Sequence, residues 1–435
     1  MIKVALATLG CKVNQVESEA IKEDLLRQGY ELVDFSQEAE VYIINTCTVT
    51  HVSDRKSRAL IRRARRRNPR AWVIAVGCLA QVDGEKLASL DDVDLVLGHK
   101  EQVAEWVERV LQPDDGQAPW PRFDPGQPQA CLSPVFYTRR HERTRAFVKI
   151  EDGCEAHCSY CIVPLARGPV RSKQAEDVKR EIIQLTDLGY REIVLTGIHI
   201  GAYGRDLPPL DLTRLLNYLL DETPDNYRLR LGSVEPLEIS RPFIALLKGS
   251  RRICRHLHIP LQSGSDRILQ DMNRHYRRDY FKNLVEELAA EIPGIAITTD
   301  VMVGFPGEAQ GDFEETYALL KDLPLRDMHV FKFSPRPGTP AAYMPEKVPE
   351  HDKQERSGLL LRLAQEKERA FINSQEGQVT EVLVERALSN GNYWGLTDNY
   401  LNVEFADSRS EVGELVRVEF KAGGRGRIGH KKGQA

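Results

Sequence analysis

Short apolar runs alternate with amphipathic stretches over residues 1–112. The runs that predict strands are KVALATL, EVYIINT, AWVIAVG and VDLVLG. The stretches between them repeat apolar residues at helical spacing, and EQVAEWVERVLQ predicts a closing helix. This alternation predicts a parallel sheet covered by helices, in which ligands bind beyond the carboxyl ends of the strands.

The alternation resumes with longer helices from about residue 140 to residue 335. Six strands are predicted there, namely RAFVKI, EIVLTG, RLRLG, HLHIP, AITTDVMVG and DMHVFKF. Six strand–helix units predict a partial (β/α)6 barrel, whose active site forms at the carboxyl ends of its strands.

The last part of the chain changes to strand-like alternation around Gly and Asn turns, which predicts a small antiparallel β-barrel with a basic tail. Residues 113–139 are rich in Pro, Gly and Gln and predict a linker. We therefore expect an α/β protein with domains at residues 1–112, 140–371 and 372–435.

Charge is segregated along the chain, although the net charge is only −4. Residues 54–70, DRKSRALIRRARRRNPR, are strongly basic, and so are TRRHERTRAFVK and the C-terminal tail. Three basic groups in one chain favour a polyanionic partner. No apolar run approaches the roughly 18 residues of a membrane span, and the N-terminus lacks a signal-peptide layout. We expect a cytoplasmic protein with no membrane partner, whose cysteines are kept reduced.

Three cysteines each follow a predicted strand of the first domain. Cys11 comes after the first strand, Cys47 ends the second and Cys78 follows the third. Because parallel strands end at one edge of a sheet, the three thiols are expected to converge there. Structural cysteines would instead lie within the strands. Cys131 and Cys254 have no assigned role, and burial in the core is the default for Cys254.

A second cysteine group, CEAHCSYC, lies directly after the first predicted barrel strand and contains Cys154, Cys158 and Cys161. Three thiolates on one loop can bind three irons of a cubane iron–sulfur cluster and leave the fourth iron open to a ligand. Zinc is the alternative, with His157 as a fourth ligand, but structural zinc usually takes its ligands in two separated pairs.

The C-x3-C-x2-C spacing, with Tyr160 before the third cysteine, resembles the signature of radical S-adenosylmethionine (SAM) enzymes. TLGCKVNQVESE, INTCTVT and GCLAQ resemble the N-terminal cysteine motifs of the radical SAM methylthiotransferase family. LHIPLQSGS and DVMVGFPGE resemble its central domain, and the ending resembles its RNA-binding TRAM barrel. The KVN and TCTVT segments resemble those of the branch that acts on N6-threonylcarbamoyladenosine in tRNA.

The resemblance implies an enzyme that adds a methylthio group to C2 of N6-threonylcarbamoyladenosine at position 37 of tRNA, without a protein acid or base. Cys154, Cys158 and Cys161 would hold one 4Fe–4S cluster, and a second would be held by Cys11, Cys47 and Cys78. S-adenosylmethionine would be both methyl donor and radical source. An electron donor of flavodoxin or ferredoxin type and a sulfur source are further expected partners.

Six residues at predicted strand ends and in the cysteine loop are expected to contact the cofactor, with packing or turn roles as the alternative: Tyr160, Gly197, Ser233, Glu235, Gln262 and Ser263. Arg167 and Arg171 are expected to meet the substrate or the sulfur of the second cluster, or to form a salt bridge to a barrel helix.

RNA contacts are expected from the basic helix and from the last domain. Arg62, Arg65 and Arg66 would hold phosphates of the anticodon stem-loop. Aromatic side chains read unstacked bases, and Tyr393, Trp394 and Tyr400 are candidates either for this role or for the core of the small barrel, whereas Phe405 is expected in that core. The alternatives are the same chemistry on isopentenyladenosine or on a ribosomal-protein aspartate, and a non-catalytic, metal-bearing RNA-binding protein.

Overall fold

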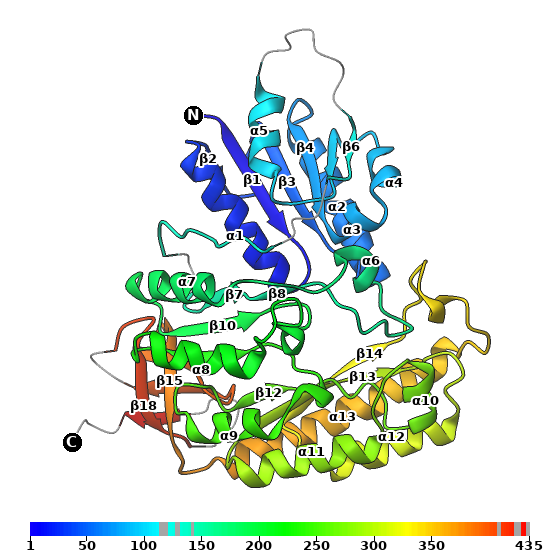
Figure 1. Cartoon of the computed structure of the whole chain (residues 1–435), viewed down its shortest axis with the longest axis vertical. Helices are drawn as coiled ribbons and strands as arrows, with labels where there is room; N and C mark the ends of the chain where they lie inside the picture. The colour runs from blue at the N-terminus through cyan, green and yellow to red at the C-terminus, as the bar shows by residue number, and fades with distance from the viewer. Residues whose placement is uncertain (113–120, 127–130, 141–142, 407–409, 422–427, 432–435) are drawn as a thin grey trace.

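The computed structural model describes residues 1–112, 121–126, 131–140, 143–406, 410–421 and 428–431. Figure 1 shows an N-terminal sheet with its helices at the top, an open arc of strands and helices below it, and a strand-rich C-terminal part beside the arc. In the described part of the chain, no helix is long and apolar enough to cross a membrane.

The N-terminal sheet has six parallel strands in the order β2-β1-β3-β4-β5-β6. They are β1 (Lys3–Thr8), β2 (Glu31–Val33), β3 (Val41–Thr46), β4 (Trp72–Gly77), β5 (Leu95–Leu97) and β6 (Phe123–Asp124). The four predicted strands are all present. The two short edge strands were not predicted, because two or three residues carry too little periodicity. β6 falls inside the predicted linker, whose residues 113–120 and 127–130 lie outside the described residues.

Helices cover both faces of this sheet, which is why its central strands are apolar on both sides. They are α1 (Lys12–Arg27), α2 (His51–Arg67), α3 (Cys78–Val82), α4 (Gly84–Ala88) and α5 (Val103–Leu111). Along β3, Tyr42 and Ile44 pack toward α2, whereas Val41 and Ile43 pack toward α1 and α5.

The central part is a half-barrel of two three-stranded parallel sheets, β11-β10-β7 and β12-β13-β14. Its strands are β7 (Ala146–Lys149), β10 (Glu192–Thr196), β11 (Arg228–Leu231), β12 (His256–His258), β13 (Ala296–Val303) and β14 (Asp327–Lys332), which confirms the six predicted strands. Isolated bridges join the two sheets, one of them between Ser233 and His258. Within the described residues β7 and β14 form no strand pair, so the barrel is open on that side.

The outer layer of the half-barrel consists of α7 (Ala175–Asp187), α8 (Leu212–Glu222), α9 (Arg241–Gly249), α11 (Arg278–Glu291), α12 (Gln310–Asp322) and α13 (Glu350–Ser374). Strand residues alternate between this layer and the lumen. Leu229 and Leu231 of β11 join the apolar core beneath the helices, whereas Arg228 and Arg230 face inward and pair with Glu192 of β10.

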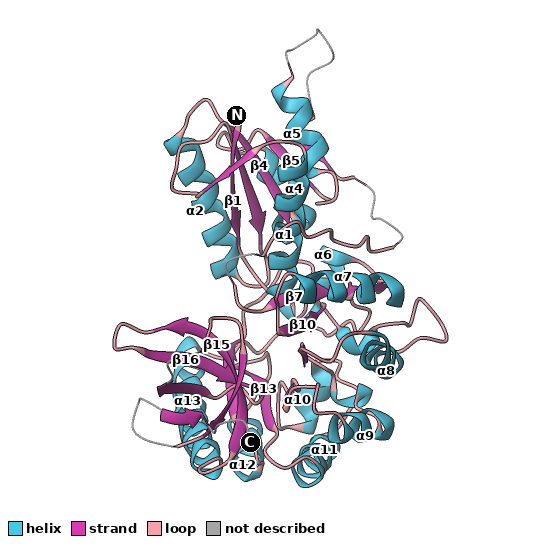
Figure 2. Cartoon of the chain, turned by 90° about the vertical axis from the view of Figure 1, so that its left-hand side faces the viewer, coloured by secondary structure: helices cyan, strands magenta, loops and turns pink. Residues whose placement is uncertain are grey.

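The C-terminal strands form a closed barrel in the order β15-β16-β17-β19-β18. They are β15 (Val379–Ala387), β16 (Asn392–Thr397), β17 (Asn402–Ala406), β18 (Leu415–Glu419) and β19 (Ile428–Lys431). Phe405 lies in the barrel core, as predicted. Arg228 and Arg230 donate hydrogen bonds to carbonyls of Leu396 and Thr397, so the C-terminal barrel docks against the lumen of the half-barrel (Figure 2).

Candidate active site

The sheet places the three N-terminal cysteines at the carboxyl ends of three neighbouring strands. Cys11 is the residue before α1, Cys47 directly follows β3, and Cys78 is the first residue of α3 after β4. Gly10, at φ +102°, lets the first loop pass close to the second, because a Cβ there would lie 3.1 Å from the Cys47 Sγ. The fold therefore brings these three thiols to one edge of the sheet, as predicted.

Asn14 fixes the spacing of these loops. Its side-chain amide donates to the carbonyl of Leu9 at 2.8 Å and to that of Thr46 at 3.0 Å, so the loops after β1 and β3 are tied together. Burial raises the pKa of the Cys47 thiol, and the neighbouring Cys78 and Cys11 raise it further. A metal centre bound by these sulfurs would displace their protons.

The second triad lies on the loop that follows β7 and the short strand β8 (Glu151–Asp152). Two polar side chains from other loops approach its sulfurs: His199 Nδ1 lies 3.5 Å from Cys154 Sγ, and Arg274 Nη1, after the helix α10 (Asp266–Asp271), donates to Cys158 Sγ at 3.4 Å. Burial raises the pKa of Cys161 to about 12. Hydrogen-bond donors around ligating sulfurs are an outer shell that tunes a metal centre.

The donor sets fit a cluster better than a single zinc ion. In neither triad do the three sulfurs all lie within 4.8 Å of one another. Thiolates that share one tetrahedral zinc lie only about 3.8 Å apart, given Zn–S bonds of about 2.3 Å, whereas a cubane spreads them over different irons. His157, the proposed fourth zinc ligand, is exposed.

The two triads lie on adjoining parts of the structure. The short helix α6 (Val163–Arg167) follows Cys161 directly and packs on α3, which begins with Cys78. At the end of α6 the buried Arg167 donates to Glu17 of α1 at 2.8 Å, to Asp152 at 2.8 Å and to Asn14 at 2.5 Å. Arg167 thereby joins the N-terminal sheet to the half-barrel.

The charge of Arg167 is fixed by this network. Burial alone would lower its pKa, but Asp152, Cys78 and Glu17 raise it well above its usual range. Arg171 pairs with Asp152 at 3.4 Å on the outer side. Of the alternatives for Arg167, a salt bridge is therefore present. Among the described residues its partners are Glu17 of α1 and Asp152 of β8, and no barrel helix contributes one.

The six predicted cofactor residues fall into two groups. Glu235 pairs with Arg274, which also contacts Cys158, so Glu235 lies near the second triad. Ser233 lines a separate cavity of the lumen. Tyr160 packs on an apolar cluster that includes Met272.

The other three are built into the barrel wall. A Cβ at Gly197 would lie 2.7 Å from Glu151 Oε2, Gln262 bridges to Val301 with φ +70°, and the Ser263 hydroxyl accepts from the backbone of Ser265.

Three residues at the site were not predicted. Arg274 and His199 reach the sulfurs, and Glu151 accepts a hydrogen bond from the backbone N–H of His199 at 2.6 Å. Burial raises the pKa of Glu151 to about 8. Arg274 stands among the arginines of NRHYRR, and His199 follows a turn-like glycine, so neither differs from a surface residue in the sequence alone.

The basic helix α2 presents only part of its charge to solvent. Arg62 and Arg66 are exposed. Arg65 is half-buried, forms an ion pair with Asp94 at 2.5 Å and donates to the carbonyl of Ala71 at 2.9 Å. Arg65 thus holds the helix on the sheet, and the exposed neighbours remain candidates for phosphate contacts.

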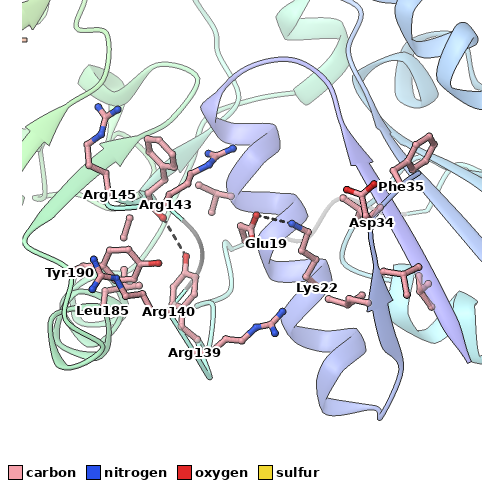
Figure 3. Close-up of a pocket in the computed structure, with 18 residues that line it drawn as sticks. Glu19, Lys22, Asp34, Phe35, Arg139, Arg140, Arg143, Arg145, Leu185 and Tyr190 are labelled. Carbon is pink, nitrogen blue, oxygen red and sulfur yellow. Dashed lines mark hydrogen bonds and ion pairs between the residues drawn. The ribbon is translucent and has the colours of Figure 1, made fainter. Parts of the chain in front are cut away.

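A second basic surface lies between α1 and β7, where a cavity of about 520 Å³ opens. Figure 3 shows Arg139 and Arg143 reaching toward α1, which carries Lys22, whereas Arg145 points away from the gap. Arg143 stacks over the ring of Phe147 at 5.6 Å. Stacked and exposed guanidinium groups suit phosphate and base contacts.

Comparison with known proteins fits this site. The radical SAM superfamily matches residues 148–320, and the uncharacterized protein family UPF0004 matches residues 3–98. The half-barrel with its cysteine loop is thus a radical SAM domain, which binds S-adenosylmethionine and a 4Fe–4S cluster. The structure of the radical S-adenosylmethionine methyltransferase TsrM from Kitasatospora setae, with cobalamin and a [4Fe–4S] cluster bound, has the same fold: the TM-score is 0.59 at 16% identity, over 78% of this chain and 77% of that one.

Relatives that match nearly the whole chain identify the family within the radical SAM superfamily. A threonylcarbamoyladenosine tRNA methylthiotransferase of Bacillus subtilis is 40% identical to this chain, over 97% of this chain and 95% of the relative. One of Aquifex aeolicus is 38% identical, over 96% of this chain and 100% of the relative. A tRNA-2-methylthio-N6-dimethylallyladenosine synthase of Clostridium perfringens is 34% identical, over 95% of this chain and 94% of the relative. The chain belongs to the radical SAM tRNA methylthiotransferase family, as its motifs predicted, and is an enzyme.

Proposed function

We propose that this protein converts N6-threonylcarbamoyladenosine at position 37 of tRNA into its 2-methylthio derivative in the cytoplasm. The observation that carries this proposal is the contact of α6 with α3, which brings Cys161 and Cys78 of two different domains to one junction. Sulfur insertion at an unactivated aromatic C–H requires a radical source and a sulfur donor in one chamber, and two thiol triads at one junction meet that requirement.

Each triad is proposed to hold one 4Fe–4S cluster, and S-adenosylmethionine is proposed to bind at the Cys154–Cys161 loop. When bound, these groups would supply the hydrogen-abstracting radical and the transferable sulfur. The chain itself orients them: Arg274 donates toward Cys158, His199 lies within hydrogen-bond reach of Cys154, and Arg167 fixes the distance between the domains. An external electron donor of flavodoxin or ferredoxin type and a sulfur source are part of the proposal.

The tRNA is proposed to lie across the exposed arginines. Arg62 and Arg66 of α2 and Arg139 and Arg143 before β7 are exposed and would neutralise backbone phosphates. Both sets lie on segments next to the junction of the two domains, because α2 follows Cys47 and Arg143 bonds Gln15 of α1.

The proposal is tested by expressing the protein in a bacterium that lacks the corresponding tRNA modification and analysing tRNA nucleosides by mass spectrometry. Wild type is expected to restore 2-methylthio-N6-threonylcarbamoyladenosine, whereas Cys47→Ser and Cys158→Ser variants are not. Cys131→Ser, an exposed thiol outside both triads, is the matched control and retains activity. Appearance of 2-methylthio-isopentenyladenosine instead would contradict the proposed substrate.

A further inference from the structure

A separate cavity lies in the lumen of the half-barrel, where all three parts of the chain meet. It has a volume of about 520 Å³. Its walls include Lys12 of α1, Ser233, His258 and Asp300 of the half-barrel, and Tyr400 and Asn402 of the C-terminal barrel. The volume is in the range that small ligands occupy in proteins. The position next to Cys11 places the cavity beside the proposed cluster junction without being part of either triad.

The cavity carries a positive charge, that of Lys12, for which the described residues provide no ion-pair partner. Among the described residues Lys12 makes no ion pair, and it is exposed at the mouth of the cavity. Its charge reaches His256, whose pKa is lowered well below the usual value by burial and by the neighbouring cations. His256 is buried, and its Nδ1 has no hydrogen-bond partner among the described residues. An anionic ligand would compensate the Lys12 charge.

The opposite wall offers a strong acceptor. Both His258 Nε2 and His329 Nδ1 lie 3.1 Å from the same oxygen of Asp300, its Oδ1. Burial alone would raise the pKa of Asp300, but the two imidazoles lower it to about 2, so the group is a carboxylate. Within the described part of the chain its hydrogen bonds all fall on Oδ1, which leaves Oδ2 to accept from a ligand O–H or N–H.

Aromatic rings border the cavity. Tyr400, at φ +62°, is held by Arg230 at 3.8 Å over its ring and by the edge of His256 at 4.4 Å. Phe331 is 46% exposed at the rim. Exposed rings at the edge of a polar cavity are where an unstacked nucleobase is held.

We propose that this cavity binds the N6-threonylcarbamoyl substituent of the substrate adenosine, with Lys12 on its carboxylate and Asp300 accepting from its hydroxyl or urea N–H. The inference rests on the proposed function. The substituent carries an anion and several donors that match the two walls. An isopentenyl group offers neither, and it would cover the Lys12 ammonium and the Oδ2 of Asp300 without giving either a partner. Lys12 and Asp300 are thus specificity-determining residues of the enzyme.

The test uses three anticodon stem-loop RNAs of one sequence that differ only at position 37, with adenosine, N6-threonylcarbamoyladenosine or isopentenyladenosine. Affinity for the full chain is measured by fluorescence anisotropy, which does not depend on turnover. Wild type is expected to bind the threonylcarbamoyl RNA roughly tenfold or more tightly than the other two, as one charge-assisted hydrogen bond allows. Lys12→Met is expected to lose this preference, so that its affinities for the three RNAs become similar.

One control variant and two further test variants separate the possible outcomes. Lys248→Met removes an exposed lysine on α9, away from the cavity, and keeps the preference. Lys12→Arg retains part of it, which shows that charge is what Lys12 provides. Asp300→Asn, which lies far in sequence from the cysteine loop, also weakens the preference. Iron content is measured for each variant, because Lys12 follows Cys11.

Retention of the wild-type preference by both Lys12→Met and Asp300→Asn would overturn the inference, even if the enzyme makes the 2-methylthio product. Absence of that product in the nucleoside assay would instead remove the proposed function. A divalent metal other than iron that is bound by wild type and lost in Asp300→Asn would also overturn the inference, because His258, Asp300 and His329 would then be metal ligands.

Discussion

Replacing Glu192 by Gln should detach the C-terminal barrel from the half-barrel. Glu192 is fully buried and pairs with Arg228 and Arg230, each at 2.6 Å. These arginines donate to carbonyls of the C-terminal barrel, so one buried carboxylate pairs with both of the cations that dock it. Breaking a buried pair by removing one partner costs about 3–5 kcal/mol, because the remaining charge is left uncompensated.

The loss can be measured as faster hydrogen exchange of the backbone amides in β15 and β16. Each 1.4 kcal/mol is a factor of ten, so exchange should accelerate roughly 100-fold to 4,000-fold in the Glu192→Gln variant. The matched control is Glu291→Gln, which removes an exposed pair with Lys248 and should leave exchange in these strands unchanged. Equal exchange rates in wild type and Glu192→Gln would refute the docking role of this network.

The pairing of Glu192 with Arg228 and Arg230 also predicts that docking of the C-terminal barrel depends on pH. Burial alone would raise the pKa of Glu192, but Arg230 and Arg228 lower it from 4.5 to about 2. Because the folded-state pKa is depressed, the stabilisation is fully present above pH 4.5 and is lost as the pH falls from there toward 2. The difference between wild type and Glu192→Gln should therefore shrink across that window.

Three further perturbations test other parts of the account. Arg167→Met leaves Lys149 as a cation shared by Glu17 and Asp152 but removes a buried hydrogen-bond donor from both, so urea unfolding followed by tryptophan fluorescence should show a loss of about 1–3 kcal/mol; a loss no larger than that of an exposed arginine would contradict the interdomain role. The Arg62→Gln/Arg66→Gln double variant should lower the salt dependence of tRNA binding by about 1.5 to 2 units of slope without loss of iron, and an unchanged slope would place the tRNA elsewhere. Phe405→Ala, in the centre of the C-terminal barrel, should destabilise that barrel by about 3–5 kcal/mol in hydrogen exchange, and normal protection would show that the core does not depend on this ring.

The periodicity of the sequence was sufficient for the sheet and half-barrel because their central strands, such as β3 and β10, are buried on both faces. The apolar runs of β3 and β10 therefore stand out, and the residues after them are placed at one edge by the parallel topology. For the same reason Cys47 and Cys78 could be assigned to one site from their positions alone.

Residues that act through inward-facing charge could not be predicted in this way. Arg228 and Arg230 occupy strand positions that look like a solvated face, yet they are buried because a third domain covers the lumen. Tyr400 was a candidate for base stacking, but its place in the cavity depends on how the C-terminal barrel docks. Arg65 belongs to a run of similar basic residues, and only the fold shows that it faces Asp94 and forms an ion pair with it.

The central claim, that each thiol triad holds its own cluster, is tested most directly by iron and sulfide content after anaerobic reconstitution. Wild type should bind about eight irons, and a Cys154/Cys158/Cys161→Ala variant and a Cys11/Cys47/Cys78→Ala variant about four each, as expected for two cubanes. About four irons in wild type and none in the Cys154/Cys158/Cys161→Ala variant would show that the N-terminal thiols hold no cluster, and the proposed sulfur insertion would be contradicted.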